Sequence, residues 1–213
     1  MNKTRPALVI GTITLTSLFT IGSTLLAFGM SEESLRLTLR ETARISTLIF
    51  ILIFIASPVH KLMKNNLSRW LMVNRRYLGI SFGISHIIHL GLILFLMLAY
   101  SNGELLKIAS VTTYTVGGIG YALIFAMLAT SNNRSVKYLG HKRWKTLHTF
   151  GMYYLLLAFL SSYIGLLEKD LFFYAPIVLS LVLACLIRAF AFFSNTANSN
   201  STNSNSTKKA RIA

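Results

Sequence analysis

Six long stretches without a charged side chain follow one another along this chain of 213 residues, and they constrain its fold more than any other feature. A helix needs about 20 consecutive, mostly apolar residues to cross the roughly 30 Å hydrocarbon layer of a bilayer. The uncharged stretches are residues 6–31, 45–60, 77–103, 108–133, 146–167 and 171–187. The sequence therefore predicts an all-α integral membrane bundle of six helices.

The composition supports this prediction and excludes two other classes of protein. Hydrophobic residues make up 54% of the chain and charged residues 13%, with a mean hydropathy of +0.59, which excludes a water-soluble enzyme. The single cysteine, Cys185, cannot form a disulfide within the chain or a metal site made of several thiolates. A disulfide-stabilised scaffold is therefore excluded as well.

Charge is divided unevenly between the two sets of loops. The amino end, the second loop, the fourth loop and the carboxyl end together carry sixteen Lys and Arg residues. The remaining loops carry five cations and all six acids of the chain. Because short loops rich in Lys and Arg stay in the cytoplasm, both termini are predicted to be cytoplasmic. The net charge of +15 then reflects topology in a lipid membrane, and no nucleic-acid partner is predicted.

The chain divides into a membrane domain, residues 1–193, and a tail, residues 194–213. The tail is basic and rich in Asn, Ser and Thr, so it has little apolar surface to bury and is predicted to be disordered. Loops within the membrane domain have at most about 16 residues, too few for an extramembrane domain that binds a nucleotide or a flavin. Such a cofactor would need a partner protein.

Ionisable residues inside a membrane span are costly and point to function. The candidates are His86 and His89 in the third span and His148 at the start of the fifth, whereas no acid lies in any predicted span. His86 and His89 are three residues apart and share one side of a helix. A neutral imidazole is a usual axial ligand of haem iron. The alternative is a structural histidine that hydrogen-bonds a neighbouring helix.

Two motifs surround these histidines: RRYLG at residues 75–79 opens the third span, and KRWKTLH at residues 142–148 opens the fifth. Together with six spans and this chain length, the motifs resemble the ferric-reductase-like transmembrane domain family. The resemblance is strongest to its small bacterial branch of MsrQ-like (YedZ) haem-binding subunits, which serve a periplasmic methionine sulfoxide reductase. It covers roughly residues 45–190.

The resemblance implies a membrane electron-transfer subunit with haem b, located in the bacterial inner (cytoplasmic) membrane. The haem would lie between the third and fifth spans, with His89 and His148 as iron ligands and His86 as the next candidate. Electrons would pass from a cytoplasmic flavin reductase carrying FMN, or from a membrane quinol, to a periplasmic oxidoreductase partner. The chain would be one electron-transfer component of an oxidoreductase system, with no catalytic residue of its own.

One departure from the family pattern concerns the second ligand. The family branch has another histidine thirteen residues after the one in the fifth span, where this chain has Ser161. At 1.5 Å per residue, His89 lies about 20 Å past Arg76, whereas His148 lies only about 5 Å past Lys145. The two histidines are therefore expected at different depths in the membrane.

Several arrangements remain open at this point. The chain could hold one haem through a single histidine, one haem through His86 and His148, or no haem. A pairing of His148 with His60, at the end of the second span, is a further arrangement. The alternative function is a haem-free membrane protein that acts as a structural subunit or as a small-solute permease.

Overall fold

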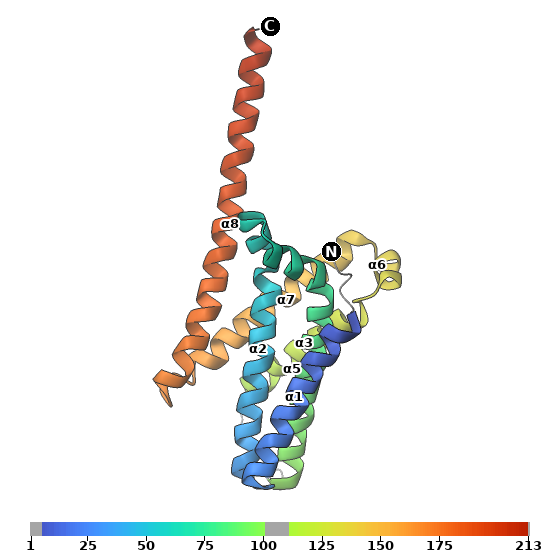
Figure 1. Cartoon of the computed structure of the whole chain (residues 1–213), viewed down its shortest axis with the longest axis vertical. Coiled ribbons are helices and arrows are strands. Elements are labelled where there is room, and N and C mark those ends of the chain that lie inside the picture. The colour runs from blue at the N-terminus through green and yellow to red at the C-terminus, as the bar shows by residue number, and fades with distance from the viewer. Residues whose placement is uncertain (1–5, 101–110, 213) are drawn as a thin grey trace.

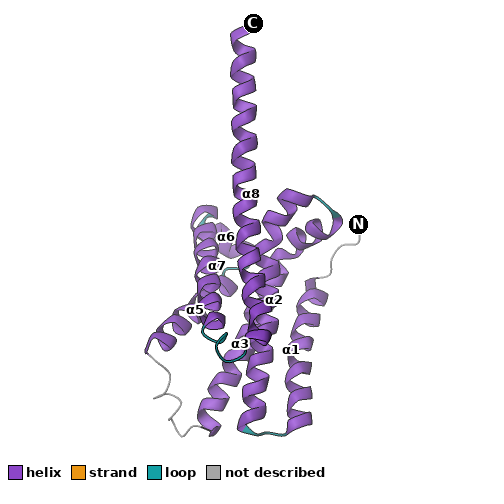
Figure 2. Ribbon diagram, turned by 90° about the vertical axis from the view of Figure 1, so that its left-hand side faces the viewer, coloured by secondary structure: helices purple, strands orange, loops and turns teal. Residues whose placement is uncertain are grey.

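The computed structural model describes residues 6–100 and 111–212, with backbone alone for residues 112 and 195–212. The described chain contains helices and short connections and no strand, which confirms the all-α class (Figure 2). The helices are α1 (Pro6–Phe28), α2 (Glu32–Met63), α3 (Asn66–Tyr100), α5 (Val111–Ala129), α6 (Asn133–Leu139), α7 (His141–Ile164) and α8 (Leu171–Ile212).

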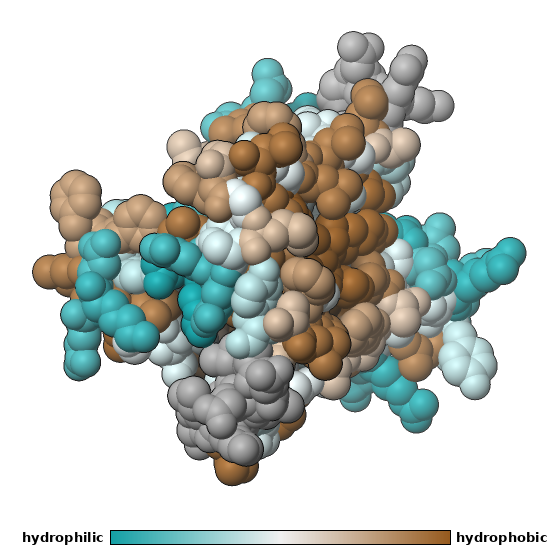
Figure 3. Space-filling view, turned by 90° about the horizontal axis from the view of Figure 1, so that it is seen from below, coloured by the Kyte–Doolittle hydropathy of each residue, from teal (hydrophilic) through white to brown (hydrophobic). Residues whose placement is uncertain are grey.

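Five of the described helices are long and apolar enough to cross a membrane. They are α1, α2, α3, α7 and the first part of α8, Leu171–Ser194. The pair formed by Thr113–Ala129 and Asn133–Leu139 is bent by 104° and makes a sixth candidate if it is counted as one span. Large apolar side chains also cover much of the exposed surface in Figure 3, as expected where lipid is the solvent. The chain is therefore consistent with a multi-pass membrane protein.

The second and third helices begin well before the uncharged stretches that predicted them. Helix α2 begins at Glu32, where Ser31 and Ser34 form a reciprocal capping box. Its charged turns stay helical because Arg36 pairs with Glu32 at 2.6 Å and Arg44 pairs with Glu41 at 2.5 Å. The prediction that charged residues mark the helix ends was wrong here, since a helix can continue beyond the hydrocarbon layer.

Helices α1, α2 and α3 pack closely through small hydroxyl side chains. Thr38, Thr42 and Ser46 recur at every fourth position of α2 and are fully buried, so they form one face of the helix. The Ser85 hydroxyl on α3 lies 3.0 Å from that of Ser46 and 3.2 Å from that of Ser17 on α1. Small polar residues are typical of helix contacts in membranes, where they allow backbones to approach and satisfy each other's hydrogen bonds.

Helix α8 continues past Ser194 to Ile212, through the segment whose composition predicts a disordered tail. Figure 1 shows this part projecting away from the other helices, on the side of the bundle where α1 also begins. Helices in proteins gain most of their stability from the packing of an apolar face, which a projecting polar helix lacks. The boundary at residue 193 between a membrane domain and a tail therefore stays a prediction.

Substitution of Gly151 is expected to disrupt the contact between α5 and α7. A Cβ atom at this position would lie 2.6 Å from the Met127 sulfur, so Gly151→Leu should lower the free energy of unfolding by about 1–3 kcal/mol. Denaturant titration in mild detergent measures this change. Gly118→Leu is the matched control, because a Cβ atom at Gly118 has no atom within 4 Å. Equal losses in both variants would contradict this view of the α5 and α7 contact.

Candidate functional site

The structure brings His86 and His89 together on α3, with ring centroids 5.4 Å apart. The His89 Nδ1 atom lies 2.9 Å from the Thr42 hydroxyl of α2. That hydroxyl is also 2.9 Å from the Thr38 carbonyl, which can only accept, so the hydroxyl donates there and accepts from His89 Nδ1–H. Thr42 thereby fixes the ring and leaves its Nε2 lone pair available, which is the usual arrangement around a metal-binding imidazole.

His86 is enclosed by aromatic rings from three helices. Its ring centroid lies 5.4 Å from that of Phe82 on α3, 5.2 Å from that of Tyr121 on α5 and 5.6 Å from that of Phe159 on α7. The side chain is 9% exposed, and its buried Nδ1 atom has no hydrogen-bond partner among the described residues. Leaving such an atom unsatisfied costs about 1–3 kcal/mol. His86 is therefore not explained as a structural histidine whose two ring nitrogens are both hydrogen-bonded.

His148 lies at a different level of the bundle. Its Nε2 atom is 3.1 Å from the Thr130 hydroxyl, and its ring lies 4.5 Å from that of Trp144. Phe159, which contacts His86, comes eleven residues later on the same helix, about 16 Å along its axis. The structure thus separates His148 from the histidine pair, and two ligands of one iron cannot be so far apart.

Helix α7 has no histidine at the depth of the histidine pair. Phe159 faces His86 there, and Ser161 is exposed, with its carbonyl accepting a hydrogen bond from the Gly165 amide at 3.2 Å. The described residues also contain no cluster of three His, Cys, Asp or Glu side chains able to hold a metal ion. For a haem, this arrangement fits ligation by one histidine of α3 and does not fit ligation by two.

A small cavity of about 230 Å³ lies beside His89. It is lined by Leu39, Arg40, Ala43, His89, Ile93, Tyr163, Leu166 and Tyr174. The Tyr163 hydroxyl on α7 lies 3.0 Å from that of Thr47 on α2, which fixes one wall of the cavity. Ligand pockets usually have 300–1,000 Å³, so a porphyrin at this position would require α7 to move away from α3.

The residues that surround the histidines could not be selected from the sequence. Thr42, Tyr121 and Phe159 are ordinary hydroxyl and aromatic residues of membrane helices, and their role depends on which helices are neighbours. Arg76 of the RRYLG motif binds the Ser131 carbonyl and the Asn133 amide oxygen, both at 2.7 Å, and so ties α3 to the bend between α5 and α6.

Comparisons with models of protein families, with curated proteins and with solved structures found no match for this chain. The contacts of its own residues therefore carry the functional argument.

Loss of the Thr42 hydroxyl should release the His89 ring. Thr42→Val keeps the shape of the side chain, removes the acceptor for Nδ1–H and should cost roughly 0.6–1.7 kcal/mol of unfolding free energy, the range for hydrogen bonds between membrane helices. Denaturant titration in detergent measures it. Thr16→Val is the control, since the exposed Thr16 hydroxyl bonds only the carbonyl of Thr12 in its own helix. An equal effect in both variants would show that the contact with His89 contributes nothing.

Proposed function

We propose that this protein is an electron-transfer subunit of the ferric-reductase-like class that binds one b-type haem through His89, one member of the histidine pair of α3. The observation that carries the proposal is the pair itself. His89 is oriented by Thr42 with Nε2 available, and the adjacent His86 has a buried nitrogen without a partner. Burial of ionisable side chains in a membrane span is expensive and is typical of functional sites.

Within this proposal, His89 would hold the haem iron through its imidazole, and Thr42 holds the tautomer of that ring. A single proximal histidine is sufficient to hold haem iron in several protein classes. The rings of Phe82, Tyr121 and Phe159 pack around His86 and shield it from water. A haem bound here would supply one-electron exchange. His148 is assigned to the packing of α7 against Thr130, because it lies at a different level.

The donor and acceptor follow from the resemblance and from the predicted topology. In a six-span bundle with both termini in the cytoplasm of a bacterium, a flavin reductase or a quinol would donate electrons. A periplasmic oxidoreductase would accept them. The bend between α5 and α6 supports six crossings if the two helices form one span. Figure 1 also supports an even number, since α1 begins and α8 ends toward the same end of the bundle.

Optical spectra of the purified protein test the haem proposal. After expression with ample haem and purification in mild detergent, the reduced-minus-oxidised spectrum should contain a b-type band. His89→Ala should abolish this band and His86→Ala should weaken it, whereas His148→Ala should keep it. His141→Ala is the matched control, because His141 is exposed at the start of α7. A wild-type protein without haem absorbance would overturn the proposal.

A haem-free structural subunit or small-solute permease is the second candidate, and one observation favours it. Phe159 packs against His86, Phe50 and Phe82, so aromatic side chains already fill the space between α3 and α7. A close-packed interior of this kind is stable without a macrocycle. The optical test separates the two candidates, since this one predicts no haem band in any variant.

Labelling of single cysteines tests the predicted orientation. In a Cys185→Ser background, Glu168→Cys should react with a membrane-impermeant maleimide in intact cells. Lys137→Cys should react only after permeabilisation, because the Lys-rich and Arg-rich loops are predicted to be cytoplasmic. Both side chains are exposed, so access depends on the side of the membrane. The reverse pattern would contradict the orientation, and unlabelled Cys185→Ser protein provides the background.

A further inference from the structure

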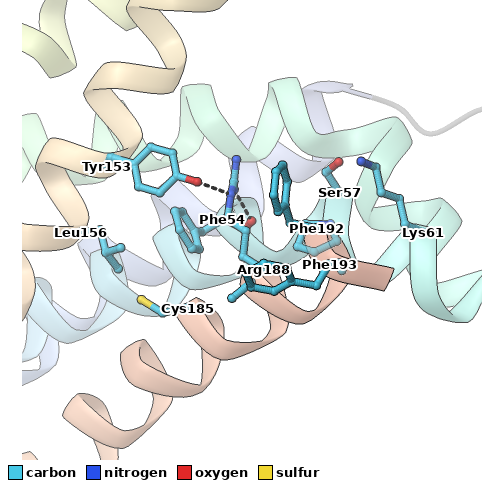
Figure 4. Close-up of a pocket in the computed structure, with 12 residues that line it drawn as sticks. Phe54, Ser57, Lys61, Tyr153, Leu156, Cys185, Arg188, Phe192 and Phe193 are labelled. Carbon is cyan, nitrogen blue, oxygen red and sulfur yellow. Dashed lines mark hydrogen bonds between the residues drawn. The ribbon is translucent and has the colours of Figure 1, made fainter. Parts of the chain in front are cut away.

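A second cavity lies away from the histidine pair, between α2, α7 and α8. It has a volume of about 480 Å³, within the usual range of ligand sites. Its lining combines two cations, Lys61 and Arg188, with apolar side chains that include Phe54, Phe192 and Phe193. Figure 4 shows Lys61 and Ser57 on α2 to one side of the Phe192 ring and the Arg188 guanidinium of α8 to the other.

Arg188 is held in place at the wall of this cavity. Its Nε atom donates to the Tyr153 hydroxyl and its Nη1 atom to the Phe54 carbonyl, both at 3.0 Å (Figure 4). The guanidinium carbon also lies 4.5 Å from the Phe54 ring centroid. A guanidinium has five N–H donors, of which these contacts with described residues use two. The remaining donors are thus on a side chain whose position is already fixed.

Among the residues that the structure describes, the positive charge at this cavity has no acidic counterpart nearby. Glu41 precedes Lys61 by twenty residues on α2, about 30 Å along the helix axis. Asp170, just before α8, precedes Arg188 by eighteen residues, about 27 Å. Arg75 of α3 adds to the imbalance, because its charge and that of Arg188 are close enough to repel each other. An anion bound between Lys61 and Arg188 would relieve this repulsion.

We propose that the cavity binds an anionic glycerophospholipid of the surrounding membrane. Its phosphate would pair with the cations that line the cavity, Lys61 and Arg188, and an acyl chain would pack against the phenylalanines of α8. The charges fit the phosphate, and the apolar lining fits a lipid in preference to a free phosphate ion. Basic pockets between membrane helices on the cytoplasmic side are a recurrent form of such sites. The site is independent of haem binding.

Lipid titration of the full-length protein in mild detergent tests this site, with bound lipid counted by native mass spectrometry. Dioctanoyl phosphatidylglycerol should bind more tightly than dioctanoyl phosphatidylcholine. Lys61→Gln and Arg188→Gln should each weaken phosphatidylglycerol binding about fivefold and leave phosphatidylcholine binding unchanged. Lys137→Gln is the matched control, since it removes an exposed cation of α6 outside the cavity.

Lys61 is exposed, so Lys61→Gln keeps the test decisive if Arg188→Gln fails to fold. Equal affinity for the two lipids, or wild-type affinity in Lys61→Gln, would overturn the proposal. Displacement of phosphatidylglycerol by an equal concentration of inorganic phosphate would also overturn it, because the site would then recognise a free anion without the acyl chains.

Discussion

A bilayer interior offers no water to pair with buried polar groups, and this constraint determines how the spans are built. Hydroxyl side chains in α2 donate hydrogen bonds to backbone carbonyls of their own helix. Thr38 donates to the Ser34 carbonyl at 2.7 Å and Thr42 to the Thr38 carbonyl at 2.9 Å. Each hydroxyl still has lone pairs to accept a bond from a neighbouring helix. The same residues can therefore pack tightly and hold an imidazole in one orientation.

In the part of the chain that the structure describes, few buried polar side-chain atoms lack a hydrogen-bond partner. Buried atoms without a hydrogen-bond partner occur in Thr14, Arg44, Asn74 and His86. Arg44 has an ion pair with Glu41, and the Asn74 amide donates to a backbone carbonyl, so each is partly satisfied. Thr14 has a hydroxyl that binds metals poorly. His86 is the member of this group with a nitrogen suited to a soft or transition metal, and it adjoins a second imidazole.

Two chemically different regions lie at different depths of the bundle. His86 sits among aromatic rings in the interior, where a charge would be expensive. The cavity at Lys61 and Arg188 lies between α2, α7 and α8, where Tyr153 and the Phe54 carbonyl anchor a guanidinium. Long apolar stretches separate most of the cations from the acids, and they leave an unneutralised basic surface at one end of the bundle.

The locations of the spans were predictable because hydrocarbon thickness sets the length of an apolar run. Their ends were less so. Helix α2 starts at Glu32 through a serine cap and local ion pairs, and the predicted fourth span bends by 104° after Ala129. There, Thr130, Ser131 and Asn132 bond carbonyls of the preceding turn, and these local bonds compete with a continuing helix. A hydropathy profile detects neither the serine cap that starts α2 nor the side-chain bonds at the bend after Ala129.

The sequence by itself determined that the chain is helical and apolar, that most cations lie in other loops than the acids, and that His86 and His89 share a helix face. These properties follow from composition and from the periodicity of a single helix. Only the tertiary structure decided that Thr42 orients His89, that Phe159 faces His86, and that Lys61 and Arg188 line one cavity. Contacts between helices depend on how far each helix is tilted and rotated, and residue spacing along one helix carries no information about its neighbours.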